Sequence, residues 1–515
     1  MSIIDWCIVI AFIGALIALG FHFAHRNRNL KDYFLAGKSM PGWLVALAAT
    51  GTSISAGTFV GSPELGFNTN LTYLMLCVAA IIGGVLVAAL FLPKLYKANT
   101  ITIYGYIGER FGEASKRWTS GMFLLGQLFT SGSRLFIAAI AVSVILYGSI
   151  HFQFLVYSII ILGTVATLYT MVGGIKGLIY IDTLQILLVV GTGLVALLAV
   201  YFSMSSDMSL TQIWDSMVHG QVKVAGQWTE GNKLQVVDPS FRFDVPYNLV
   251  GALVACTIFK VAQFSTDHEF VQRQLTCQNV SKAGTALVVS QVISLPIVLI
   301  FLSIGLLLFV KYSHSDPAAL AHFQGDARDL FPQYICHSIP AGVRGLMMVG
   351  LLAAALSSFN SAINSMASSF TTDLYLPILK GRGREISGDN AQMKSSKKMA
   401  ALMGLLLTGF AIFTAVLQEK SGMNLVDFAT GVMCLSYAGM LGVFLVALFT
   451  RRGNTRSVVA ALIVGLLVVF FLMNARSLFG VNLNIAWPWW TPIGALFSFT
   501  ICYLGKPGKA SQQAS

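Results

Sequence analysis

Apolar runs near or above 20 residues recur from one end of this chain to the other. An α-helix needs about 20 residues to cross the hydrocarbon core of a bilayer. Charged residues make up only 10% of the sequence, whereas a soluble domain carries about 25%. Because backbone polar groups in lipid must be satisfied within the segment, spanning segments of this kind are helices. The sequence therefore predicts an all-α integral membrane protein.

The apolar runs divide into about 13 predicted transmembrane helices. Between them, two longer stretches at 204–246 and 312–340 are expected to be solvated outer connections, with short helices at most. The predicted spans are 3–23, 43–66, 72–93, 120–147, 152–173, 179–203, 247–271, 284–311, 341–372, 398–417, 424–449, 456–473 and 487–504.

The location of the basic residues decides what the net charge of +12 means. If the N-terminus lies outside, the main Lys and Arg clusters all fall on the cytoplasmic side, as the positive-inside rule requires. We therefore expect a multi-pass plasma membrane protein, of the bacterial inner membrane type, with a cytoplasmic C-terminus and no nucleic-acid partner. The clusters include Arg26 and Arg28, Lys94 and Lys97, Lys380 and Arg382, Arg451 and Arg452, and Lys506 and Lys509.

The middle of the second predicted span is rich in glycine, serine and threonine, with the sequence Gly51-Thr52-Ser53-Ile54-Ser55-Ala56-Gly57-Thr58. Irregular backbone within the membrane is tolerated only where it lines protein or a water-filled cavity. Such a segment can unwind and present free carbonyls to a cation. The alternative is close helix packing through small residues, which is common in membranes.

The ninth predicted span carries a second polar cluster. Ala354, Ser357, Ser358 and Ser361 are spaced i, i+3, i+4 and i+7, so they share one helix face. Hydroxyl oxygens in a row suit a hard cation that has shed its water. The alternative is that these serines bond back to carbonyls of their own helix.

Three ionisable residues lie inside predicted spans: Arg134, Asp182 and Lys260. Each costs about 2.5–3.5 kcal/mol on insertion scales, so each should face the bundle interior. Asp182 could ligate a cation or carry a proton, and the two bases could bind an anionic substrate. Buried ion pairs, or snorkelling near a helix end, are the alternatives.

The run from Asp267 to Arg273 places a histidine between two acids at the inner end of the seventh span. The spacing does not put two metal ligands on one helix face, so a gate or an ion-pair cluster is favoured. Gly173-Gly174-Ile175-Lys176-Gly177 lacks the pattern of an ATP-binding loop and indicates a tight inner loop. No nucleophile–base pair or metal set is evident, so we expect no enzyme.

Several motifs together resemble the sodium:solute symporters, a family that includes sodium–glucose, proline, pantothenate and sialic acid transporters. They occur in order along most of the chain. The motifs are Tyr33 to Lys38 with Met40 to Trp43, Ser53 to Ala56 with Phe59 to Gly61, Gly173 to Gly177 with Asp182 and Gln185, Gln272-Arg273, Ala354 to Ser361, and Tyr437 to Leu445.

The resemblance implies a LeuT-like fold, an inverted repeat of five plus five helices with flanking helices and a substrate held at mid-membrane. The repeats would be the second to sixth and the seventh to eleventh spans. The chain would then divide into an N-terminal helix and cytoplasmic loop, a first repeat, an extracellular loop, a second repeat and C-terminal helices with a short cytoplasmic tail. The corresponding ranges are 1–42, 43–203, 204–246, 247–449 and 450–515.

The resemblance also implies where the coupling ion, Na⁺, would bind. The first sodium site would use the carbonyls of Gly51, Ile54 and Ala354 and the hydroxyls of Ser357 and Ser358. Some members hold a second sodium. Here the second sodium site would consist of Asp182, Ser357, Asn360 and Ser361, with Asn360 standing where clear two-sodium members have a hydroxyl.

The implied substrate set consists of Ser55, Thr58, Arg134, Lys260 and Gln263. Arg134 falls near a position where sialic acid transporters grip a carboxylate, a task that suits the planar guanidinium. The polar pocket of glucose carriers is poorly matched. We therefore expect sodium-coupled symport of a small solute, a carboxylate-bearing one rather than a neutral sugar, by a monomer in the bilayer. The alternatives are a proton-coupled carrier that uses Asp182 and a sensor that does not transport.

Overall fold

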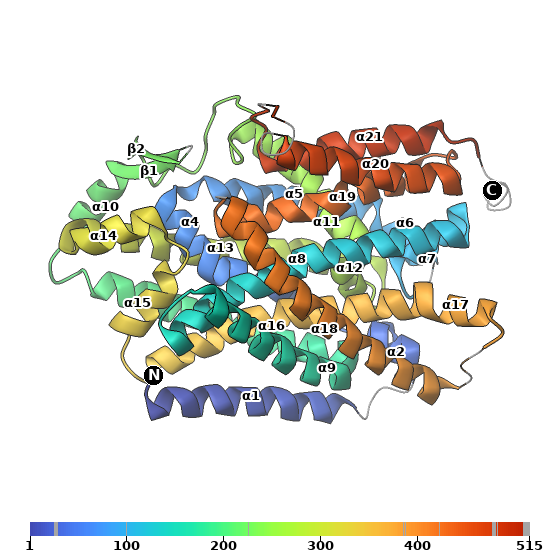
Figure 1. Cartoon of the computed structure of the whole chain (residues 1–515), viewed down its shortest axis with the longest axis horizontal. Helices are drawn as coiled ribbons and strands as arrows, with labels where there is room; N and C mark the ends of the chain where they lie inside the picture. The colour runs from blue at the N-terminus through green and yellow to red at the C-terminus, as the bar shows by residue number, and fades with distance from the viewer. Residues whose placement is uncertain are drawn as a thin grey trace.

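The computed structural model describes residues 1–24, 29–98, 100–224, 226–384, 386, 388–421, 423–475, 480–481 and 483–507. Arg26, Arg28, Lys509 and most of the predicted tail therefore lie outside the described residues. Helices dominate and run roughly along the long axis of the molecule (Figure 1).

Ten helical segments in this described part are long and apolar enough to cross a membrane. Helix α9 supplies two of them, because it changes direction at Gly174 (φ 64°, ψ 176°), a backbone conformation that only glycine adopts easily. The helices concerned are α1 (Ile3–Ala24), α5 (Leu74–Leu90), α8 (Glu113–Tyr147), α9 (Phe152–Phe202), α13 (Val280–Ser315), α16 (Val343–Ser369), α18 (Asp389–Ser421), α19 (Leu425–Phe449) and α20 (Thr455–Asn474).

A bent pair of helices makes an eleventh candidate if the two are counted as one span. Helix α3 (Gly42–Ser53) and the segment Gly57–Asn68, which ends in α4 (Ser62–Asn68), are bent by 57°. The two remaining predicted spans, 247–271 and 487–504, fall on shorter helices, Gly251–Thr266, which includes α11 (Thr257–Thr266), and α21 (Trp490–Leu504). All thirteen predicted ranges thus overlap helix. The remaining helices connect them: α2 (Leu30–Leu35), α6 (Leu92–Ala98), α7 (Ile103–Phe111), α10 (Leu210–Val218), α12 (His268–Gln274), α14 (Pro317–Gly325), α15 (Leu330–Ser338) and α17 (Leu376–Gly381).

One end of the bundle carries α10, α14, α15 and a two-stranded hairpin (Figure 1). Its strands, β1 (Gly220–Val224) and β2 (Gln227–Gly231), pair antiparallel. This hairpin departs from the expectation of a purely α-helical chain. It forms because Trp228 stacks on Phe309 of α13 at 6.1 Å and meets Phe67 of α4 edge-on, so one face of a short polar loop is anchored to the bundle.

A buried lysine ties the hairpin to the broken span. Lys233 is 0% exposed, and its Nζ donates to the carbonyls of Phe67 (2.7 Å) and Thr69 (3.1 Å). The amine also lies 4.0 Å from the centre of the Phe309 ring. Burial lowers the pKa of this amine to about 7. The loop that contains the hairpin is therefore bonded directly to the last turn of α4.

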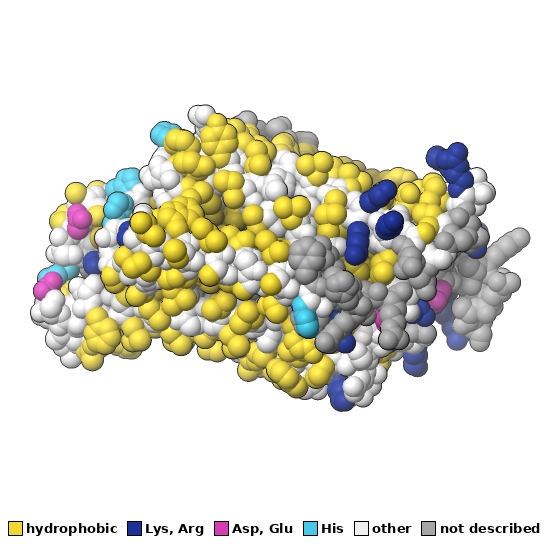
Figure 2. Space-filling view, turned by 90° about the horizontal axis from the view of Figure 1, so that it is seen from below, with side chains coloured by type: hydrophobic (Ala, Val, Ile, Leu, Met, Phe, Trp, Pro, Cys, Tyr) yellow, Lys and Arg dark blue, Asp and Glu magenta, His cyan; other side chains and the backbone are white. Residues whose placement is uncertain are grey.

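Charge is distributed unevenly between the two ends. The N-terminus lies beside α15 and α16, whereas α21 ends at the opposite end of the molecule, beside α6 and α7 (Figure 1). Figure 2 shows most of the visible Lys and Arg side chains at that second end and an apolar belt along the middle. This distribution is the one that the positive-inside rule predicts for a bundle in a membrane.

Candidate functional site

The centre of the molecule contains the break in the second span. Helix α3 ends at Ser53, and Ile54 takes extended backbone angles (φ −91°, ψ 107°). The chain then restarts as a short π-helical turn, Gly57–Gly61. This is the unwound segment that the glycine- and serine-rich sequence predicts.

The break leaves carbonyls of α3 without backbone donors. The last α-helical bond runs from the Ile54 amide to the Thr50 carbonyl at 2.8 Å. No backbone amide in the described ranges donates to the carbonyl of Gly51 or Ile54. The restarting helix, in contrast, is capped, because the Ser55 carbonyl accepts from Thr58 and Phe59 and the Ser55 hydroxyl accepts from Gly57. The gap therefore exposes the electronegative end of one half-helix.

Helix α16 packs against this broken end. A Cβ atom added to Gly51 would lie 3.2 Å from the Ser357 hydroxyl and 3.2 Å from the Asp182 carbonyl, so α3, α9 and α16 meet here. Ala354, Ser357 and Ser358 are each 1% exposed. The Ser358 Oγ is buried and has no hydrogen-bond partner among the described residues. The predicted first sodium site thus combines unbonded carbonyls on one helix with a free hydroxyl on the other.

The predicted second sodium site is occupied by protein groups. Arg273 of α12 donates from Nη2 to the Asp182 carboxylate at 2.5 Å and also to the Ser361 hydroxyl. Ser357 donates to the other oxygen of Asp182 at 2.8 Å, and Thr170 donates to Asn360 Oδ1 at 2.8 Å. Contacts through Arg273 and Ser357 therefore join Asp182, Ser357 and Ser361 in one group, whereas Asn360 bonds to Thr170.

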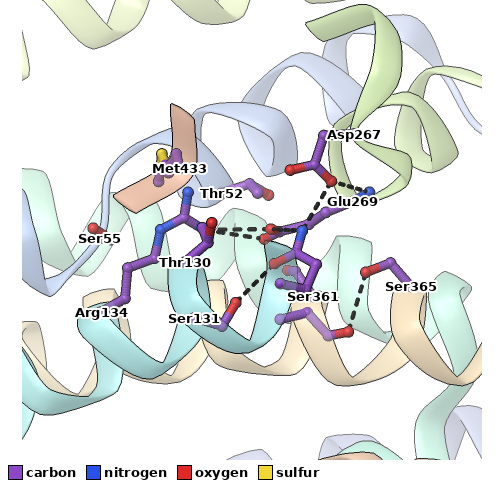
Figure 3. A network of polar contacts seen from close by, with 12 residues as sticks. Thr52, Ser55, Thr130, Ser131, Arg134, Asp267, Glu269, Ser361, Ser365 and Met433 are labelled. Carbon is purple, nitrogen blue, oxygen red and sulfur yellow. Dashed lines mark hydrogen bonds and ion pairs between the residues drawn. The ribbon is translucent and has the colours of Figure 1, made fainter. Parts of the chain in front are cut away.

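Arg134 belongs to a polar network around Glu269 (Figure 3). Its Nη1 lies 3.3 Å from Glu269 Oε2, and both side chains are buried. Gln127 donates to Asp267 at 2.8 Å and to Glu269 at 3.1 Å, and Tyr437 donates to the other oxygen of Asp267 at 2.6 Å. The acids of the 267–273 run therefore form the ion-pair cluster that the spacing favours. Among the described residues, no group of three or more metal-binding side chains was found.

The rest of the substrate set divides into two groups. Lys260 donates to Gln263 at 3.0 Å on α11, and Gln263 Nε2 lies 4.0 Å from Met433 Sδ of α19. Ser55 and Thr58 line the break itself and are each 8% exposed. In the described part of the chain, no hydrogen bond joins Lys260 or Gln263 to Arg134.

Sequence reasoning left two important residues without a role. Gln127 lies on the same helix face as Ser131 and Arg134, and this i, i+4, i+7 polar spacing in an apolar span could have indicated it. Arg273 was noticed only as part of a motif. An intramembrane Asp182 needs a cationic partner, and this requirement could have pointed to the Arg at the end of the buried run 267–273.

The family model described as sodium:solute symporter family matches residues 33–465. This chain belongs to the sodium:solute symporter family. The match confirms the resemblance that the motifs carry.

Other members of the family are similar over nearly the whole chain. The sodium/sialic acid symporter NanT of Aliivibrio fischeri is 23% identical, over 98% of this chain and 93% of that protein. The symporter SiaT of Proteus mirabilis is 24% identical, over 93% of this chain and 90% of that protein. A solved structure of a substrate-bound, outward-open, Na⁺-coupled sialic acid symporter superimposes with a TM-score of 0.81 at 22% identity, covering 98% of this chain and 97% of that one. This likeness shows that the fold is shared.

Proposed function

We propose that this protein is a secondary transporter that couples entry of one small organic solute to sodium at the first sodium site. The observation that carries the proposal is the buried Ser358 hydroxyl without a partner, on the helix that contacts the broken end of α3. A buried polar group of this kind is costly unless a ligand satisfies it. Oxygen ligands of hydroxyl and carbonyl type suit Na⁺, a hard cation.

Sodium at this position would hold α3 against α16. Any substrate that binds better to this ordered state raises the affinity for sodium by the same factor, because coupling between two ligands is reciprocal. An inward membrane potential adds about 2.3 kcal/mol per charge per 100 mV. Release on the low-sodium side then resets the carrier.

We propose a coupling ratio of one sodium per solute. The second sodium site supports this ratio because Arg273 already supplies a positive charge to Asp182. A sodium ion there would have to displace a buried guanidinium. The same ion pair argues against the proton-coupled alternative, since the Asp182 carboxylate already has a buried cationic partner in Arg273.

The solute that fits best carries a carboxylate. Arg134 donates to Glu269 through Nη1. A guanidinium has five N–H donors in a planar fork that matches a carboxylate, so its other donors could bind the acid group of a solute. The named relatives NanT and SiaT carry sialic acid, which is an acidic sugar. The substrate set would then place Arg134 on the acid group and Ser55, Thr58, Lys260 and Gln263 on the rest of the solute.

The wider architecture follows from the same proposal. Thirteen spans would form two inverted five-helix repeats, 43–203 and 247–449, with the N-terminus outside and the C-terminus in the cytoplasm. The protein would work as a monomer in a bacterial inner membrane and would not be an enzyme. Most of the visible Lys and Arg side chains lie at one end of the molecule (Figure 2), and all thirteen predicted ranges overlap helix. Both observations support this arrangement.

The test is uptake by purified protein in liposomes. Radiolabelled sialic acid, a neutral sugar and an amino acid would be offered under an inward gradient of Na⁺, K⁺ or H⁺ at a fixed membrane potential. We expect accumulation of the acid with the Na⁺ gradient alone. Equal uptake under a proton gradient without sodium would reject sodium coupling.

A further inference from the structure

An apolar groove runs along the membrane face of the bundle between α5, α11, α19 and α21. It has a volume of about 490 Å³ and is lined by side chains such as Leu86, Leu90, Val261, Leu445 and Leu496. Figure 1 shows α21 above these helices at the edge opposite α1. The cavity falls within the size range of ligand sites in proteins, and within a bilayer such a groove must be filled by an apolar chain.

The cytoplasmic mouth of the groove is marked by aromatic rings from two helix ends. Phe91, next to α5, and Phe449, at the end of α19, both line the groove. Their rings meet edge-on at 5.6 Å. Phe499 of α21, another lining residue, stacks on Tyr503 at 5.7 Å.

Two cations lie on these rings. Lys94 Nζ is 4.0 Å from the centre of the Phe449 ring and donates to the Leu448 carbonyl at 2.5 Å. The Arg452 guanidinium is 4.9 Å from the centre of the Tyr503 ring. Neither cation forms a salt bridge to an acid in the described part of the chain. The mouth therefore carries two positive charges that lack an acidic partner.

We propose that this groove holds an acyl chain of an anionic phospholipid whose phosphate contacts Lys94 and Arg452. Basic residues at the cytoplasmic side of gaps between transmembrane helices bind anionic headgroups. The apolar walls of the groove suit the acyl chain, and the two cations select an anionic headgroup by charge. The groove lies between helices of both proposed repeats and α21, so the lipid would join them.

The experiment counts bound lipid by native mass spectrometry. Purified protein would be placed in nanodiscs of equal parts phosphatidylglycerol and phosphatidylcholine, then released and weighed. We expect the wild-type protein to retain phosphatidylglycerol over phosphatidylcholine. In the Lys94→Gln/Arg452→Gln variant, the ratio of retained phosphatidylglycerol to phosphatidylcholine should fall about fivefold for each charge removed.

Two further variants test whether the preference depends on charge at this position and whether lipid retention depends on the acyl chain in the groove. Lys380→Gln/Arg382→Gln removes the same charge at the end of α17, away from the groove, and should leave the preference intact. Leu445→Trp fills the groove without changing charge and should reduce the amount of retained lipid of either kind. Equal retention of both lipids by the wild type would overturn the proposal. So would an equal loss of preference in the two double variants, or a preference that survives Lys94→Gln/Arg452→Gln.

Discussion

The two predicted sodium sites lie side by side and share Ser357, yet they differ in what their oxygens already do. At the first site, within the described part of the chain, the Ser358 hydroxyl has no hydrogen-bond partner and the Gly51 and Ile54 carbonyls accept from no backbone amide. At the second site the carboxylate of Asp182 is held by Arg273 and Ser357. The comparison teaches that the same kind of oxygen-bearing side chain can bind an ion or stabilise the fold. Which of the two it does depends on whether a basic side chain, such as Arg273, already pairs with it.

The strongest test of this contrast removes the internal cation. Arg273→Met leaves Asp182 charged, buried and unpaired, which should lower the free energy of unfolding by about 3–5 kcal/mol. The double variant Asp182→Asn/Arg273→Met should recover much of this loss, since the two residues are coupled. Chemical unfolding in detergent measures both.

The surface pair Arg242–Asp244 is a matched control. It has the same 2.5 Å separation as Arg273–Asp182, but its side chains are 54% and 37% exposed. Arg242→Met should therefore cost about 0–1 kcal/mol. A loss for Arg273→Met no greater than for this control would mean that Asp182 does not depend on Arg273.

Next in size is the effect of removing the free hydroxyl. Ser358→Ala deletes one ligand of a charged ion, and a hydrogen bond or ligand to a charged group is worth about 1.5–3 kcal/mol. The sodium concentration for half-maximal uptake should rise about 10- to 100-fold. Ser365→Ala on the same helix is the control, because that hydroxyl is already bonded to Ala362 at 3.1 Å. Unchanged sodium dependence of Ser358→Ala would remove the first site.

Arg134 is an intermediate case, since only Nη1 is bonded to Glu269. Arg134→Ala should lower uptake of carboxylate-bearing solutes about tenfold more than uptake of neutral ones, because the lost contact is charge-assisted. Glu269→Gln should leave Arg134 in place and raise the affinity for acids a few-fold. Competition assays with acid and amide forms of one solute measure the difference. Equal losses for both forms would assign Arg134 to structure alone.

The smallest effect is expected for the coupling ratio. If Arg273 takes the place of a second ion, Asp182→Asn should still move one sodium per solute, although with less stable protein. Reversal potentials of reconstituted protein give this ratio. A wild-type ratio of two that falls to one in the variant would instead place a second sodium at Asp182.

Much of the fold follows from sequence because the membrane restricts it. Each of the thirteen ranges predicted from hydropathy overlaps helix, although only ten helical segments of the described residues are long and apolar enough to span a membrane. The Gly51–Thr58 composition predicted the break, since only helices and cavity-lining irregular segments are stable there. The β1–β2 hairpin was not predicted. Its two strands have only five residues each. The hairpin is held by the contact of Trp228 with Phe309, a residue far away in the sequence.

The candidate site was predictable as a list of residues but not as a set of bonds. Periodicity placed Ser357 and Ser358 on one face of α16. It could not show that Ser357 donates to Asp182 while the Ser358 hydroxyl has no partner among the residues that the structure describes. Partners such as Arg273 and Glu269 are separated from Asp182 and Arg134 by 91 and 135 positions, so their pairing depends on how the two halves of the chain pack.

Lys233, two residues after the hairpin, connects it to the broken span that contains the predicted first sodium site. Its amine holds the last carbonyls of α4, and the other end of that rigid half-helix, Gly57–Asn68, begins beside Ser55 in the gap. A movement of the hairpin would therefore be transmitted to the break through the helical segment Gly57–Asn68. An antibody fragment that clamps β1 and β2 from outside would stall the carrier without entering the solute path.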